Sequence, residues 1–149
     1  MRGVAKALAA LLCLGSSRAA FNASNLEFVA APRAWEAAQA DCRSRRSHLV
    51  QIANDQENAA VLALLQAHGT EFPSSNGYGG AWIGATDTAH EGRWGTYTKW
   101  NTGEPNNWMD NEHCAAMWVN EEGKCCTNTN VLEPCNCTPT RMWADVNGR

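Results

Sequence analysis

Cysteine content is the feature that most constrains how this chain folds, because its 149 residues include seven cysteines. The first, Cys13, lies in an apolar run from Ala7 to Leu14 that follows two basic residues. Small residues come next, and Ser17-Arg18-Ala19 has the small-x-small pattern of a cleavage site. Residues 1–19 are therefore predicted to be a secretory signal peptide, whose removal takes Cys13 with it and sends the protein to the extracellular space.

The cysteines after the predicted leader form an even set, which small secreted domains typically use for disulfides. Sequence alone does not choose among the possible pairings. The last four could instead bind zinc, but structural zinc sites prefer cysteines separated by about two to four residues. These four are adjacent or one residue apart, so disulfides are the favoured use. The disulfide candidates are Cys42, Cys114, Cys125, Cys126, Cys135 and Cys137.

Bulk properties indicate one domain with no affinity for nucleic acid or for the interior of a membrane. The length suits a single hydrophobic core. A formal net charge of −3 gives no electrostatic reason to expect nucleic acid. The apolar run of the leader is too short to span a bilayer, and no later stretch is apolar enough. Two sequons make Asn22 and Asn136 candidate glycosylation sites.

Hydrophobic spacing predicts two helices followed by short strands and long loops. Trp35, Ala38 and Cys42 recur at helical spacing between residues 33 and 45, after a lead-in over residues 20–33 that holds a first strand. Asn54 or Asp55 is expected to cap a second helix from residue 56 to about 67. Its expected buried face is Ala60, Val61, Leu64 and Leu65. Strands are expected at 81–85, 93–97 and 114–119, and residues 120–140 form a cysteine-rich insertion.

Glu104-Pro105-Asn106 is the strongest indication of a binding site, with Glu112 a short loop away. A hard cation such as calcium is bound by several carboxylate and amide oxygens that converge from a loop. An X-Pro bond can be cis at modest cost. A cis bond before Pro105 would turn the oxygens of Glu104 and Asn106 toward one point.

These features, together with Trp82-Ile83-Gly84, Trp100 and Cys114, resemble the C-type lectin-like domain over Ala34 to Asp145. The resemblance implies an α+β fold in which two helices flank short antiparallel sheets beside a long calcium-binding loop region. It places the domain at residues 34–149. In this family Cys42 would pair with a cysteine of the last strand, and Cys114 with one just after the Trp143-Ala144-Asp145 segment. The chain has neither cysteine before Arg149, so it is either a fragment, which is the favoured interpretation, or its insertion cysteines take over those roles.

The resemblance also implies a calcium ion that binds sugar directly through Glu104, Asn106, Glu112 and Asp145. The Glu-Pro-Asn order resembles the family version that favours mannose, glucose, N-acetylglucosamine and fucose. Members usually have Asn-Asp after the tryptophan, whereas this chain has Ala144, so one metal ligand and one amide donor are missing. Trp108 lies in the loop and is a candidate for stacking on a sugar ring.

An auxiliary calcium site of the family would use Asp87, Glu91 and Asn107, with Glu112 shared between the two sites. His113 occupies a position where members with this site have an acid. The alternative is that Asp87 and Glu91 are solvated loop charges.

The sequence thus predicts a secreted, calcium-dependent module that binds mannose-type glycans. The alternative is a domain of the same fold that has lost sugar binding and recognises a protein or another surface through its loop face, which Ala144 favours. No nucleophile elbow, zinc-protease helix or phosphate loop is present, so an enzyme is not expected. No heptad repeat indicates how the chain would assemble, and its oligomeric state is left open.

Overall fold

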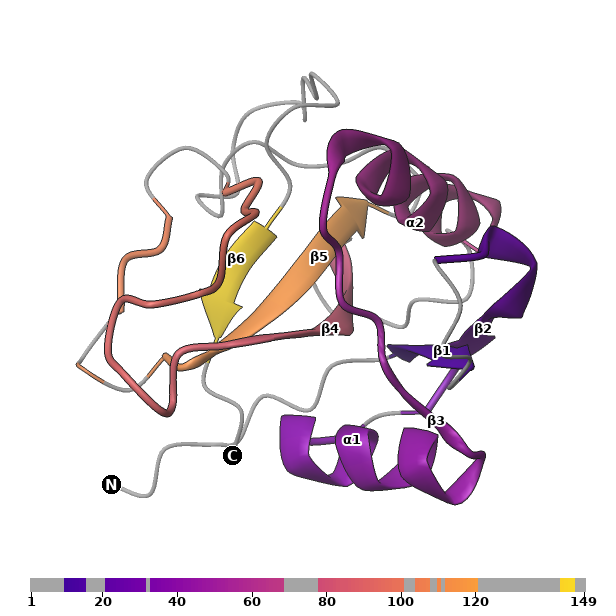
Figure 1. Cartoon of the computed structure of the whole chain (residues 1–149), viewed down its shortest axis with the longest axis horizontal. Coiled ribbons are helices and arrows are strands. Elements are labelled where there is room, and N and C mark those ends of the chain that lie inside the picture. The colour runs from indigo at the N-terminus through magenta and orange to yellow at the C-terminus, as the bar shows by residue number, and fades with distance from the viewer. Residues whose placement is uncertain are drawn as a thin grey trace.

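The computed structural model describes residues 10–15, 21–31, 33–68, 78–100, 104–107, 110, 112–120 and 143–146. Two α-helices and a six-stranded sheet make up this part of the chain, as Figure 1 shows. The elements in chain order are β1 (Ala10–Gly15), the 3-10 turn η1 (Ala23–Asn25), β2 (Leu26–Val29), α1 (Trp35–Ser44), β3 (Ser47–Leu49), α2 (Asp55–Ala67), β4 (Tyr78–Thr86), β5 (Cys114–Asn120) and β6 (Trp143–Val146).

The strands form one sheet in the order β2-β1-β4-β5-β6, and β3 also pairs with β1. All pairings are antiparallel except that of β1 with β4, which is parallel. In Figure 1, α1 and α2 lie on opposite sides of the strands. The predicted α+β class with two helices is therefore confirmed, although the described strands form a single mixed sheet instead of several antiparallel ones.

Successive side chains of β4 point to opposite faces of the sheet, and each face contributes to a core cluster packed against one helix. Ile83 packs with Val61 and Leu65 of α2, whereas the neighbouring Trp82 packs with Ala38 and Cys42 of α1. Successive side chains of a strand point to opposite faces, so β4 serves both cores. The indole of Trp82 is fully buried, and its N–H donates to the carbonyl of Arg33 at 2.8 Å, so the polar atom of this large side chain is satisfied.

Both helices lie where the periodicity predicts them. Asn54 caps α2, since its Oδ1 accepts a hydrogen bond from the Glu57 N–H at 2.9 Å. Glu57 in turn accepts from the Ala53 N–H at 2.7 Å, which satisfies another amide at the start of the helix. The expected buried face is partly confirmed. Val61 and Leu65 are buried, Ala60 and Leu64 are only partly buried, and Asn58 and Leu62 join the core.

The strand predicted at 93–97 is wrong, because this segment is a loop in the structure. Gly92 and Gly95 have φ angles of +75° and +107°, which interrupt an extended conformation. Two aromatic side chains of this loop nevertheless pack against the rest of the domain. Trp94 meets Trp100 edge to face, with ring centroids 4.8 Å apart. The hydroxyl of Tyr97 donates to Asp55 at 2.7 Å, which ties the loop to the start of α2.

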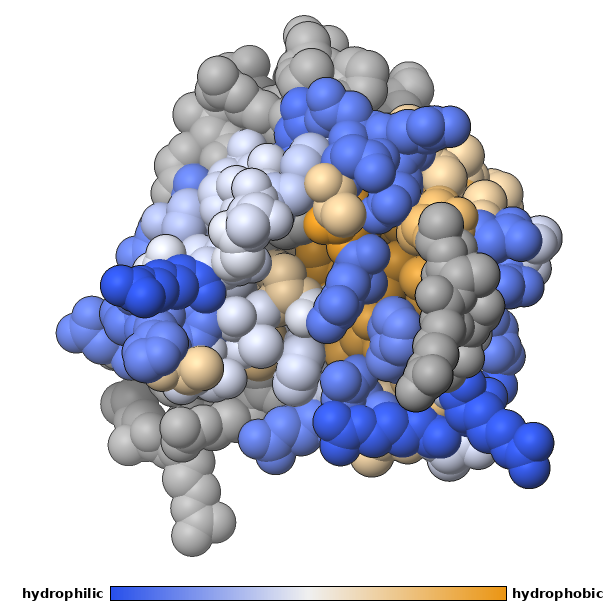
Figure 2. All heavy atoms as spheres, in the orientation of Figure 1, coloured by the Kyte–Doolittle hydropathy of each residue, from blue (hydrophilic) through white to orange (hydrophobic). Residues whose placement is uncertain are grey.

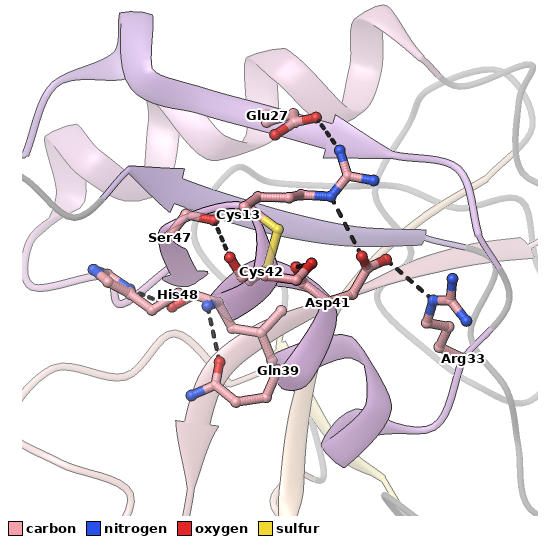
Figure 3. The surroundings of a disulfide bond; sticks show 11 residues. Cys13, Glu27, Arg33, Gln39, Asp41, Cys42, Ser47 and His48 are labelled. Atoms are coloured by element: carbon pink, nitrogen blue, oxygen red, sulfur yellow. Dashed lines mark hydrogen bonds and ion pairs between the residues drawn. A yellow bond between two sulfur atoms is a disulfide. The ribbon is translucent and has the colours of Figure 1, made fainter.

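β1 is the main departure from the expected organisation, because residues 10–15 form a strand inside the sheet. Leu11, Leu12 and Cys13 are almost completely buried. Cys13 is bonded to Cys42 of α1 by a disulfide with a Cα–Cα distance of 5.4 Å (Figure 3). The expectation that Cys13 has no part in the domain is therefore not met in this structure, where it is the partner of Cys42.

Cys114 is the second departure, because it is a buried free thiol and not half of a disulfide. Burial raises the pKa of the Cys114 thiol to about 12, with the nearby Asp87 carboxylate adding to the effect of burial. The thiol is therefore protonated and unreactive near neutral pH. Cys125, Cys126, Cys135 and Cys137 lie outside the described residues.

Ion pairs around the disulfide fasten α1 to the first strands. Asp41 lies between two arginines, at 3.1 Å from Arg33 and 3.4 Å from Arg45 (Figure 3). Arg45 also contacts Glu27 of β2 at 2.6 Å. Asp41 is 17% exposed, but its partners and Glu27 are 39–49% exposed, so each pair contributes at most about 1 kcal/mol.

Gly84 is the position where β4 approaches its neighbour most closely. Its N–H donates to the Val50 carbonyl at 2.7 Å, and a Cβ placed on Gly84 would lie 2.7 Å from the Leu49 carbonyl oxygen. We expect Gly84→Ala to lower the free energy of unfolding by about 1–3 kcal/mol, because the backbone must shift to admit the methyl group. Urea unfolding of the full chain measures this. Gly15→Ala is the control, since its Cβ would make an ordinary contact of 3.6 Å. Equal midpoints for wild type and Gly84→Ala would contradict the close packing.

Candidate functional site

The predicted motif residues lie together at the start of the loop that leads to β5. The peptide bond between Glu104 and Pro105 is cis, the form that the sequence analysis considered. The amide nitrogen of Asn106 donates to Oε1 of Glu104 at 3.0 Å, so the two oxygen-bearing side chains on either side of the proline are adjacent. Glu104 is partly buried with its Oε2 inside the protein, and Asn106 is exposed. The pair offers carboxylate and amide oxygens at the protein surface.

Asn107 is hydrogen-bonded to two later residues of this segment, Asp110 and Glu112. Asn107 has φ of +43°, and its carbonyl accepts from the Asp110 N–H at 2.9 Å. Its side-chain oxygen accepts from the Glu112 N–H at 3.1 Å. Glu112 is 8% exposed, and this hydrogen bond fixes its backbone at the point where the loop enters β5.

The fourth predicted ligand, Asp145, lies on β6. The backbone of Asp145 pairs with Ala115, the second residue of β5. The antiparallel pairing thus brings β6 alongside the end of β5 that follows Glu112, although the two segments are distant in sequence. Ala144 pairs with Ala116 in the same ladder. Trp108 and Asn136 lie outside the described residues, and Asn22 is an exposed residue that caps η1.

A second group of ligand atoms lies beside this loop. Asp87, Glu91 and His113 each offer one ligand atom, and these atoms all lie within 4.8 Å of one another. Nδ1 of His113 is 3.2 Å from Oδ1 of Asp87 and 3.3 Å from Oε2 of Glu91. The amide nitrogen of Asn107 donates to Oε1 of Glu91 at 2.9 Å, so Asn107 turns a donor toward this group and not an oxygen. His113 was missed as a ligand by the sequence analysis, which placed it only as a substitute for an acid.

The two groups differ in the ions that their chemistry fits. Glu104 and Asn106 form an adjacent pair that provides only carboxylate and amide oxygens, which are the ligands that calcium prefers, and Glu112 would add another carboxylate. The group of Asp87, Glu91 and His113 contains an imidazole nitrogen, which suits a transition metal better than calcium. The oxygen-only set therefore fits a calcium ion, and the second set does not.

Two further features describe the surroundings of the site. A pocket of about 480 Å³ is lined by residues 50–53, 83–86 and 93–97, and none of the predicted ligands lines it. In Figure 2 the coloured surface over the loops that follow β4 is mostly hydrophilic or intermediate in hydropathy, which suits a polar ligand. Among the described residues, no helix is long and apolar enough to cross a membrane.

Comparison with known proteins agrees with this architecture. The family model of the lectin C-type domain matches residues 31–138. The C-type lectin lectoxin-Enh5 of Pseudoferania polylepis is 30% identical over 96 residues, which are 58% of this chain and 57% of the relative. The hepatic lectin of Gallus gallus is 32% identical over 94 residues, 57% of this chain and 40% of that protein. The chain thus matches little more than half of the lectoxin.

Solved structures share the fold. The structure of the EPNH mutant of CEL-I has a TM-score of 0.53 at 26% identity and covers 77% of this chain and 74% of that chain. The mouse scavenger receptor C-type lectin carbohydrate-recognition domain has a TM-score of 0.51 at 22% identity, with 78% and 75% covered. Neither the family model nor these relatives indicates an enzyme. The lectin C-type family model covers more than half of the residues of this chain, so the chain belongs to the C-type lectin domain family.

Proposed function

We propose that this protein is a secreted carbohydrate-binding module in which a calcium ion, held by Glu104, Asn106, Glu112 and Asp145, binds mannose-type sugars. The observation that carries the proposal is the contact between Asn106 and Glu104 across the cis proline bond. It places one carboxylate and one amide side by side at the surface, in a family of lectin domains.

Calcium would supply the charge that attracts two neighbouring hydroxyls of a sugar ring. Each hydroxyl has lone pairs and one O–H, so it can bind the ion and also hydrogen-bond to a side chain. Glu104 accepts such a bond and Asn106 donates one, which explains why both residue types are needed. The contact between them, at 3.0 Å, keeps the two groups side by side, which supports a role for both in binding one sugar.

Ala144 lowers the expected affinity. An asparagine there would add one oxygen to the ion and one amide donor to the sugar. A hydrogen bond that involves a charged partner contributes about 1.5–3 kcal/mol, so its loss weakens sugar binding by about tenfold or more. The same residue favours the second candidate function, in which the loop face recognises a protein or another surface and binds no sugar.

Passage over mannose-agarose tests the proposal, because a dense matrix compensates for weak single sites by avidity. We expect the full chain to be retained in calcium and released by EDTA. Glu104→Gln should pass through unretained, since it replaces a calcium-binding carboxylate with a neutral amide. The matched control is Glu36→Gln, which removes an equal charge from an exposed position in the first turn of α1. A folded wild-type protein that flows through in both buffers would favour the second candidate.

A further inference from the structure

We propose that Asp87, Glu91 and His113 form a binding site for a zinc-class transition metal ion, separate from the calcium site proposed above. Asp87 and Glu91 lie in the turn after β4, and His113 is the residue immediately before β5. The site does not depend on sugar binding, so it can be tested whether or not the chain binds glycans.

Ligand spacing is the first argument. In a tetrahedral zinc site the metal–ligand bonds are about 2.0–2.1 Å, which places two ligand atoms roughly 3.3 Å apart. Nδ1 of His113 lies 3.2 Å from the Asp87 oxygen and 3.3 Å from the Glu91 oxygen. The two carboxylate oxygens lie within 4.8 Å of each other, so binding one ion would draw the exposed Glu91 carboxylate toward Asp87.

The orientation of the carboxylates is the second argument. Each carboxylate has one oxygen bound by a group outside the site and turns the other toward His113. Oδ2 of Asp87 accepts from the Gly92 N–H at 2.7 Å, which leaves Oδ1 facing the imidazole. Oε1 of Glu91 accepts from Asn107 at 2.9 Å, which leaves Oε2 facing it. Such outer hydrogen bonds orient metal ligands and typically change affinity by about 10- to 100-fold when they are lost.

The backbone of His113 is also fixed, which is the third argument. The carbonyl of His113 accepts from the hydroxyl of Thr86 at 2.6 Å and from the Asp87 N–H at 3.2 Å. The imidazole is therefore carried on the same hydrogen-bonded segment as Asp87, which is only 2% exposed. One side of the site is built into the fold, whereas the Glu91 side chain is 59% exposed and gives the ion a path from solvent.

A single proton on Nδ1 of His113 cannot bind both facing carboxylate oxygens as fully as a metal ion can. Nδ1 of an imidazole carries at most one hydrogen, yet it faces two carboxylate oxygens at almost equal distances. A metal ion bound to the nitrogen lone pair would contact both oxygens at once. Three protein ligands would leave a fourth position for water, as in zinc sites that keep an open coordination position.

Calorimetric titration of the full-length chain, first stripped of metal with a chelator, tests the assignment. We expect zinc chloride to bind and His113→Ala to weaken that binding by at least about tenfold, since it removes the only nitrogen ligand. His113→Asp should also weaken zinc, while calcium binding should gain from the all-oxygen set. His48→Ala is the control, because His48 lies on β3 outside the site, and it should bind zinc as wild type does.

Two results would overturn the proposal. The first is folded wild-type protein that binds no zinc. The second is zinc affinity that is the same in wild type and His113→Ala, because the ion would then be bound elsewhere, for instance at the cysteines of residues 120–140. Circular dichroism of each variant establishes that it is folded before titration. Failure of mannose retention alone leaves this titration unaffected, so the two proposals fail independently.

Discussion

Glu112→Gln is expected to lower the affinity of the folded chain for calcium by about tenfold or more. Calcium sites set their affinity largely by the number of charged ligands, and this change removes one carboxylate while keeping the size of the side chain. Glu112 is nearly buried, and its N–H is held by Asn107, so no other group readily takes its place. A loss of about 1.4 kcal/mol corresponds to tenfold in affinity.

Calorimetric titration with calcium chloride measures this effect in wild type and variant. Glu36→Gln serves again as the control for the loss of a negative charge. The Asn107 hydrogen bond uses the backbone of Glu112 and remains available in the variant, so the loop keeps its anchor. Equal calcium affinities for wild type and Glu112→Gln would remove Glu112 from the proposed site.

Loss of β1 should have the largest effect on stability. In the full-length chain, Cys13→Ser is expected to lower the free energy of unfolding by about 2–5 kcal/mol, because it removes the disulfide to Cys42. A chain that begins at Ala20 should lose more. It lacks the buried Leu11 and Leu12 and leaves β2, β3 and β4 without the strand that pairs with all three.

Denaturant unfolding of oxidised wild type, Cys13→Ser and the chain that begins at Ala20 tests this. Cys114→Ser is the control, because it removes a thiol without breaking a disulfide. A chain starting at Ala20 with the full stability of the longer one would show that β1 is dispensable. N-terminal sequencing of protein secreted by cells then shows whether residues 10–15 stay with the domain. If cleavage near Ala19, which the sequence predicts, occurs after the Cys13–Cys42 disulfide has formed, residues 1–19 stay bonded to the domain and sequencing reads two N-termini; if it occurs before, Cys13 is lost.

Local signals explain which parts of the fold could be predicted. The spacing of Trp35, Ala38 and Cys42 and the Asn54 cap depend on neighbouring residues, and both helices lie where these signals place them. The cis bond before Pro105 is likewise a local property, and it is present. Local signals therefore predicted the two helices, and they allowed the cis bond before Pro105 without requiring it.

Non-local pairing explains what was missed. A short apolar run such as Ala10–Gly15 suits both the core of a signal peptide and a buried strand, and only its partners in the sheet distinguish the two. The contact of His113 with Asp87 joins residues 26 apart in sequence, so spacing could not show it. The glycines at 92 and 95 were the sequence signal that could have identified 93–97 as a loop, since both adopt a positive φ in the structure.

The wild-type arm of the calcium titration tests the central claim most directly. It should be run on chelator-stripped protein with His113→Ala titrated beside it, so that heat present in both proteins reports the proposed site of Glu104, Asn106, Glu112 and Asp145. Saturable calcium binding with a rise in melting temperature is the result that the lectin proposal predicts, because a ligand that binds only the folded state stabilises it. Neither heat nor a change in melting temperature, from protein that is folded by circular dichroism, would contradict it.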